Sequence, residues 1–176
     1  MANVLILGLG NPFREDDGVG PAIVAALREE NLSPDVTIID GGTPGLETVL
    51  IWRGYRRVII VDAADMGLEA GQWRRFLRGE ANLPINGVGM QGSLHTAGLA
   101  EAVALAEALD LLPPELIYYG VQPAKVGWTV GLSREVQSAV TAVSESILLE
   151  LSVGDMYTGV EYTGNQPSSD PLGQSN

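Results

Sequence analysis

The sequence predicts an α/β fold, in which a mainly parallel, twisted sheet forms the middle of three αβα layers. Short apolar runs alternate along the chain with segments whose apolar residues recur at helical spacing. These runs are continuous rather than alternating, which is typical of strands that helices bury on both faces. A chain of 176 residues, 45% of them hydrophobic, has the size of a single domain with a substantial core.

The first half of the chain contains two strand-helix units. Each begins with an apolar strand that glycines follow, over residues 4–7 and 36–39. Each strand precedes a predicted helix whose apolar residues share one face: Val19, Ile23 and Leu27 in the first, and Leu46, Val49 and Leu50 in the second. Pro21 lies near the start of the first helix, and Thr43 precedes Pro44 as the expected cap of the second.

A third strand over residues 57–61 runs directly into Asp62. Residues 71–77 predict a short hairpin strand at an edge of the sheet. Residues 78–92 are predicted to form a loop.

The second half of the chain adds two helices and a strand. A helical stripe over residues 99–109 ends before Pro113, and residues 116–120 predict another strand. Ser133 is the expected cap of a last helix that reaches Ile147. Beyond it the periodicity ends and Gly, Ser, Pro, Asn and Thr dominate, so we expect one domain over residues 1–152 and a flexible tail over residues 153–176.

Composition excludes several classes of function. A net charge of -12 and a pI near 4.3 oppose binding to nucleic acid and to anionic lipid. No apolar run is long enough for membrane insertion, and no export signal is recognisable at the start of the chain. The chain has no cysteine, which removes thiolate metal sites and cysteine nucleophiles and fits a cytoplasmic location.

Polar residues at predicted strand ends indicate a site. Asp17, Asp40 and Asp62 all follow strands, and the only histidine of the chain, His95, lies just before a helix that we expect to start near Thr96. Ligands of open parallel sheets bind at the carboxyl edge, where such residues meet. Asp17, Asp62 and His95 therefore form a candidate metal site of two carboxylates and one imidazole, which suits nickel, zinc, iron or manganese.

Each candidate also has a structural interpretation. Asp16 or Asp17 is in position to cap the first helix, and Asp40 can stabilise the turn at Gly41 and Gly42. A lone histidine is more often a packed or capping residue than a ligand. Asp62 directly follows four apolar residues, so we expect it to be partly buried and to require a partner.

Well-known catalytic motifs are missing from the sequence. Residues 8–13 begin like a dinucleotide fingerprint, but Phe13 occupies the position of its third glycine. The sequence contains no Walker A lysine motif, no His-Glu-x-x-His and no Gly-x-Ser-x-Gly nucleophile elbow.

Several segments together resemble the endopeptidases that mature nickel-iron hydrogenases by trimming the C-terminus of the large subunit. The resemblance covers roughly residues 4–149 and rests on these segments in this order: Gly8-Leu9-Gly10-Asn11, Asp16-Asp17-Gly18-Val19-Gly20, Asp40-Gly41-Gly42-Thr43, Asp62-Ala63, Ser93-Leu94-His95 with Gly98-Leu99, Gly120-Val121-Gln122-Pro123, and Gly131-Leu132-Ser133 with Val136. Each segment is a weak signal alone, whereas their order and spacing are specific.

The resemblance implies a three-layer αβα fold of the phosphorylase/hydrolase-like type and an endopeptidase that acts on a hydrogenase large-subunit precursor. It implies that Asp17, Asp62 and His95 complete the coordination of nickel already inserted in the precursor, while Asp40 positions a loop or the scissile peptide. The nickel belongs to the substrate, so we expect no tightly bound cofactor, although the same ligands would accept Ni, Zn or Cd in vitro. We expect a monomer that meets its client transiently.

Two rival interpretations remain open at this point. The opening Gly8-Leu9-Gly10-Asn11-Pro12 also resembles peptidyl-tRNA hydrolases, but the histidine expected soon after it is absent and an acidic domain repels tRNA. A non-cleaving nickel-binding chaperone would need the same ligands as the protease. The resemblance is imperfect at Asp17, where relatives carry glutamate.

Overall fold

The computed structural model describes residues 3–79 and 94–153, and for residues 94–97 and 153 it describes the backbone alone. Its strands are β1 (Val4–Leu9), β2 (Val36–Gly42), β3 (Arg57–Ala63), β4 (Trp73–Leu77) and β5 (Glu115–Val121). Its helices are the short 3-10 helix η1 (Glu15–Gly18), α1 (Val19–Arg28), α2 (Thr48–Trp52), α3 (Leu94–Ala108) and α4 (Arg134–Val153). Each predicted strand and helix is therefore present. The predicted loop lies largely, and the predicted tail almost entirely, outside the described residues.

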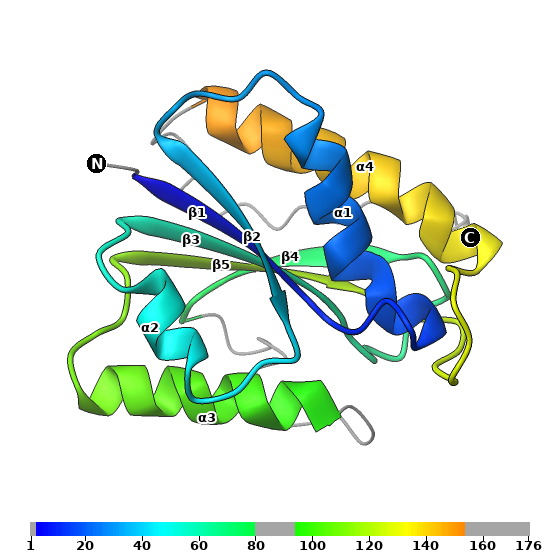
Figure 1. The fold of residues 1–176 in the computed structure, drawn as a ribbon, viewed down its shortest axis with the longest axis horizontal. Helices are drawn as coiled ribbons and strands as arrows, with labels where there is room; N and C mark the ends of the chain where they lie inside the picture. Colours follow the sequence, from blue (N-terminus) through cyan, green and yellow to red (C-terminus); the bar gives the residue numbers. More distant parts are fainter. Residues whose placement is uncertain (1–2, 80–93, 154–176) are drawn as a thin grey trace, which may run out of the picture.

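One mixed sheet of five strands, in the order β2-β1-β3-β5-β4, forms the centre of the molecule (Figure 1). Strands β2, β1, β3 and β5 are parallel, and β4 is antiparallel to β5. The predicted strand near residues 71–77 lies at an edge as expected, but the hairpin is wrong, because β5 separates β4 from β3. The buried run of β5 needs an interior position, whereas the arginines of β4 suit an edge.

Helices cover both faces of the sheet, which confirms the three-layer α/β prediction (Figure 1). Side chains of alternate strand residues pack on opposite faces. Ile6, Ile59 and Ile117 pack with α1 and α4, whereas Leu5, Leu7, Val58 and Ile60 pack with α2 and α3. No helix in the described part of the chain has the length and apolar composition needed to cross a bilayer.

Of the two predicted helix caps, the structure confirms Ser133 and contradicts Thr43. The Ser133 hydroxyl oxygen accepts a hydrogen bond from the backbone N–H of Val136 at 3.4 Å, which confirms Ser133 as a cap of α4. The expected cap of α2 at Thr43 is wrong, because this helix begins at Thr48. Gly42 has a φ of 60°, and the turn that it starts carries the chain past Pro44 before the helix begins.

A buried ion pair joins the edge strand to the end of the last helix. The Arg75 guanidinium on β4 donates to Glu150 on α4, with Nη2 2.6 Å from Oε1, and both side chains are at least 94% buried. The Tyr119 hydroxyl on β5 donates to the other oxygen of Glu150 at 2.6 Å. Burial, reinforced by the Glu150 charge, raises the pKa of Tyr119, so its phenol remains a donor throughout the physiological pH range.

We expect Glu150→Gln to lower the free energy of unfolding by about 3 kcal/mol, because it removes the charge that compensates a buried guanidinium. Glu107→Gln is the matched control. It removes the partner of Arg78 from a pair whose side chains are 65% and 41% exposed, and such pairs contribute less than about 1 kcal/mol. Urea unfolding of both variants measures the difference. An equal decrease in the free energy of unfolding for the two variants would contradict a structural role for the buried pair.

Candidate active site

The predicted site lies at the carboxyl edge of the sheet, where the strand order reverses. Strand β2, which follows β1 in the chain, lies on one side of β1, and β3 lies on the other side. Gly8 of β1 is in register with Val61 of β3, so Asp62 lies one residue beyond the last pair of these strands. This reversal point is where open α/β sheets bind their ligands.

Two glycines bring the start of α1 into direct contact with this edge. A Cβ at Gly20 would overlap the backbone of Leu9 and would lie 2.7 Å from the carbonyl oxygen of Val61. Gly10 has a φ of 124°, and a Cβ there would overlap the carbonyl oxygen of Asp17. Glycine at both positions therefore lets η1 and α1 lie directly on the ends of β1 and β3.

Asp17 is 4% exposed and lies in η1, directly before α1. Its Oδ2 accepts a hydrogen bond from the backbone N–H of Asn11 at 3.0 Å. The helix α1 has Gly18 as its N-cap and no side-chain cap bond, so the alternative that Asp17 caps this helix is wrong. The bond to Asn11 instead holds its carboxylate at the loop that follows β1.

Asp16 is fully buried and binds the segment that follows β5. Its Oδ2 accepts hydrogen bonds from the N–H groups of Ala124 at 2.9 Å and Lys125 at 3.1 Å, and its Oδ1 accepts one from Ser133 at 2.6 Å. The capping interpretation is thus wrong for Asp16 as well. Its carboxylate joins two loops that are more than 100 residues apart in the sequence.

Asp62 is the second-last residue of β3 and is fully buried, which confirms the expectation of burial. Asp62 lies two residues beyond Ile60 in the same strand, and side chains at this spacing share a face of the sheet. Its side chain therefore lies on the face that α2 and α3 cover. The hydroxyl of Tyr118 lies 3.5 Å from Asp62 Oδ2 and donates toward it. Burial, together with the Asp62 charge, raises the pKa of Tyr118 well above its usual range, which keeps the phenol protonated as a donor.

Asp40 is exposed, and its Oδ1 accepts a hydrogen bond from the N–H of Gly42 at 3.2 Å. This bond confirms the interpretation that Asp40 stabilises the turn after β2. The next turn of the chain contacts α3, since a Cβ at Gly98 would lie 2.5 Å from the carbonyl oxygen of Pro44. Asp40 therefore supports the loop against which the beginning of α3 packs.

The helix α3 begins at Leu94, two residues before the expected start near Thr96, so the prediction that His95 lies just before the helix is wrong and this residue is in the first turn. Figure 1 shows this end of α3 on the same side of the molecule as the carboxyl ends of the parallel strands. The side chain of His95 lies outside the described residues. Among the side chains that the structure does describe, no three His, Cys, Asp or Glu residues form a metal-binding group. The ligand set of Asp17, Asp62 and His95 therefore stays a prediction.

Gln122 shapes the loop that follows β3, a role that sequence analysis missed. Its Oε1 accepts hydrogen bonds from the N–H groups of Met66 at 2.7 Å and Leu68 at 3.2 Å, and its Nε2 donates to Asp65 at 3.2 Å. A buried glutamine directly after an apolar strand is the signal that could have indicated it, since such an amide needs partners.

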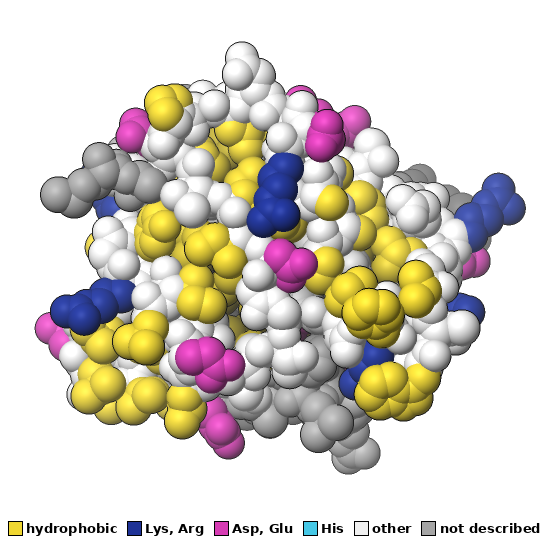
Figure 2. Space-filling view, in the orientation of Figure 1, with side chains coloured by type: hydrophobic (Ala, Val, Ile, Leu, Met, Phe, Trp, Pro, Cys, Tyr) yellow, Lys and Arg dark blue, Asp and Glu magenta, His cyan; other side chains and the backbone are white. Residues whose placement is uncertain are grey.

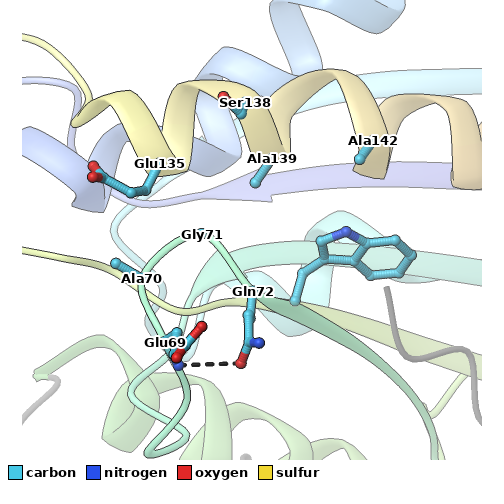
Figure 3. Close-up of a pocket in the computed structure, with 9 residues that line it drawn as sticks. Glu69, Ala70, Gly71, Gln72, Glu135, Ser138, Ala139 and Ala142 are labelled. Carbon is cyan, nitrogen blue, oxygen red and sulfur yellow. Dashed lines mark hydrogen bonds between the residues drawn. The ribbon is translucent and has the colours of Figure 1, made fainter. Parts of the chain in front are cut away.

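A separate groove of about 460 Å³ lies between α4 and the loop before β4. Figure 3 shows Glu135 and Ala139 of α4 facing the loop that contains Glu69 and Gln72. The groove is on the α4 face of the sheet, whereas Asp62 lies on the opposite face. Asp17, Asp40 and Asp62 do not line it.

Comparisons with a family model and with known proteins all point to the same family. A family model described as "Hydrogenase maturation protease" matches residues 21–150, a segment that includes Asp40, Asp62 and His95 and begins after Asp17. The chain is 34% identical over 145 residues to "Hydrogenase expression/formation protein HupD" of Rhizobium leguminosarum bv. viciae, covering 81% of this chain and 71% of the relative. It is 31% identical over 151 residues to "Hydrogenase 2 maturation protease" of Escherichia coli (strain K12), and this match covers 84% of this chain and 90% of the relative.

The fold agrees with these matches. The structure of the hydrogenase maturating endopeptidase HybD from E. coli superposes with a TM-score of 0.78 at 27% sequence identity. The superposition covers 87% of this chain and 94% of that one.

We expect Asp16→Asn to loosen the segment after β5 without unfolding the domain. One carboxylate oxygen becomes an NH₂ group, so a donor would face backbone donors in place of an acceptor. Amide hydrogen exchange at Ala124, Lys125 and Ser133 should accelerate at least about tenfold, which corresponds to roughly 1.4 kcal/mol of local stability. Asp35→Asn, at an exposed position beyond the amino edge of the sheet, is the control. Unchanged exchange at these three amides would contradict the assigned role.

Proposed function

Because the chain belongs to the hydrogenase maturation protease family and is a peptide hydrolase, we propose that it removes the C-terminal extension of a nickel-iron hydrogenase large-subunit precursor after nickel insertion. The observation that carries this proposal is the placement of two buried carboxylates, Asp17 and Asp62, at the reversal point of the sheet. Their loops are held by backbone contacts, so the carboxylates are positioned before a substrate arrives.

The nickel ion of the precursor is the feature that the site recognises. Carboxylate oxygens and an imidazole nitrogen are ligands that nickel accepts, and Asp17, Asp62 and His95 supply this set. Each of the three belongs to an element whose end lies at the carboxyl edge. An overall charge of -12 also favours a cationic centre in the partner.

Such recognition makes the enzyme a checkpoint. Ligands that bind only when the precursor brings its metal increase the affinity for the loaded precursor and leave the affinity for the empty one low. Cleavage therefore follows nickel insertion rather than preceding it. Tyr118 restrains the Asp62 carboxylate, and Asp40 positions the turn that abuts the first part of α3.

The decisive experiment mixes the protein with a hydrogenase large-subunit precursor, with and without prior nickel loading, and follows the precursor by mass spectrometry. We expect loss of one defined C-terminal peptide from the nickel-loaded precursor alone. A stable complex with no shortened product would instead indicate a non-cleaving nickel-binding chaperone. Equal cleavage of both precursors would contradict recognition through nickel.

We expect Asp17→Asn, Asp62→Asn and His95→Ala each to lower kcat/KM for the loaded precursor by at least about a hundredfold, because each removes a proposed metal ligand. Asp40→Asn should cost about tenfold or less, since an amide oxygen can still accept the Gly42 hydrogen bond. The matched control is Asp110→Asn, an exposed position beyond the other end of α3 whose φ of 56° suits asparagine. Intact processing by Asp62→Asn or His95→Ala would overturn the ligand assignment.

A further inference from the structure

Exposed apolar side chains are concentrated on two loops beside the candidate active site. Among the described residues, eight large hydrophobic side chains are exposed, and four of them lie in these loops. We call these four the carboxyl-edge patch: Phe13 is 67% exposed, Val126 45%, Trp128 81% and Val130 74%. Figure 2 shows hydrophobic side chains gathered on the side of the molecule where the segments after β1 and β5 lie in Figure 1. Surfaces of this kind mark interaction sites.

The two loops that carry the patch are held together by specific contacts. The N–H of Glu15 donates to the carbonyl oxygen of Thr129 at 2.8 Å, and the Thr129 hydroxyl donates to the Glu15 carboxylate at 3.2 Å. Lys125, the single lysine of the chain, lies 2.8 Å from the same carboxylate. The hydrogen bond from Lys125 lowers the pKa of Glu15, so Glu15 and Lys125 both stay charged near neutral pH. With the three bonds of Asp16, these contacts order the patch before any partner binds, which reduces the entropic cost of binding.

Arg14 adds a cation to the patch. Its guanidinium carbon lies 4.8 Å from the centroid of the Trp128 ring. Its Nε is buried and has no hydrogen-bond partner, and no carboxylate in the described part of the chain lies within 4 Å of the guanidinium nitrogens. In a chain with 22 acidic and 10 basic side chains, this cation is available to an anionic group from outside.

We propose that the carboxyl-edge patch is the docking surface for the client, and that it binds an extended segment of the precursor carrying an apolar or aromatic side chain and a carboxylate. The apolar side chain packs on Trp128 and Phe13, and the carboxylate binds Arg14. This inference rests on the proposed function, because it concerns the partner of the same site.

The patch is continuous with the candidate active site, which favours the client over other occupants. Phe13 is two residues from Asn11, whose N–H binds Asp17, and the N–H of Phe13 itself binds the Asn11 side chain at 2.9 Å. A segment bound to the patch is therefore led toward the buried carboxylates. A second copy of this chain fits less well, because two molecules of charge -12 repel each other.

Kinetics with the nickel-loaded precursor test the docking surface. We expect Trp128→Ala and Phe13→Ala each to raise KM at least fivefold with kcat changed less than twofold, because they remove binding contacts away from the scissile bond. Arg14→Gln should raise KM similarly and weaken its dependence on salt. Leu109→Ala is the control expected to match the wild type, because it removes an exposed apolar side chain, 55% accessible, that directly follows the C-terminal end of α3. Unchanged KM for all three patch variants, with normal cleavage, would overturn the docking surface and leave the proposed function intact.

Binding measurements with the same variants separate the remaining outcomes. Wild-type protein that binds the loaded precursor without cutting it, and loses this binding in Trp128→Ala, would support the docking surface and contradict the protease. Failure of the wild type both to bind and to cut would contradict both inferences. Sedimentation that shows a dimer of the free protein, dissociated by Trp128→Ala, would assign the patch to a second copy and overturn the client assignment.

Discussion

The close contact between the first turn of α1 and the ends of β1 and β3 is the constraint on which the site depends. Gly20 allows this contact because any Cβ there would overlap the backbone of Leu9, and Gly10 lets the loop close onto η1 in a backbone conformation that other residues rarely adopt. A sheet with the same strands but a larger residue at either position would have to move η1 outward. The carboxylates of η1 would then leave the edge where β3 ends.

Within η1, two adjacent aspartates have different roles because their side chains leave the backbone in different directions. Asp17 binds the loop after β1 and lies at the reversal point of the sheet, whereas Asp16 binds three N–H groups in the segment after β5. The second role makes the surface around Trp128 part of the same rigid unit as the candidate active site. The proposed docking surface and the predicted metal ligand Asp17 thus depend on one short 3-10 helix.

Buried charges serve two purposes in this fold. Arg75 and Glu150 form a compensated pair that attaches the edge strand to α4, on the opposite face of the sheet from Asp62. Asp62 is equally buried, but it lies at the edge where ligands of such sheets bind, and the Tyr118 phenol donates toward it. The first arrangement stabilises the fold, while the second holds the carboxylate that we propose as a ligand of the precursor's nickel.

Continuous apolar runs and helical spacing were enough to predict the layers and most strand and helix positions, because these patterns report burial directly. The sequence also indicated Asp17 and Asp62, since carboxylates after buried strands of a parallel sheet must lie at its carboxyl edge. Three features became visible only in the folded chain: β5 separates β3 from β4, Asp16 binds the segment after β5, and Glu150 pairs with Arg75. These features depend on contacts between residues that are distant along the chain. Local patterns carry no information on such partners, because the free energy of each contact exists only once the sheet has assembled.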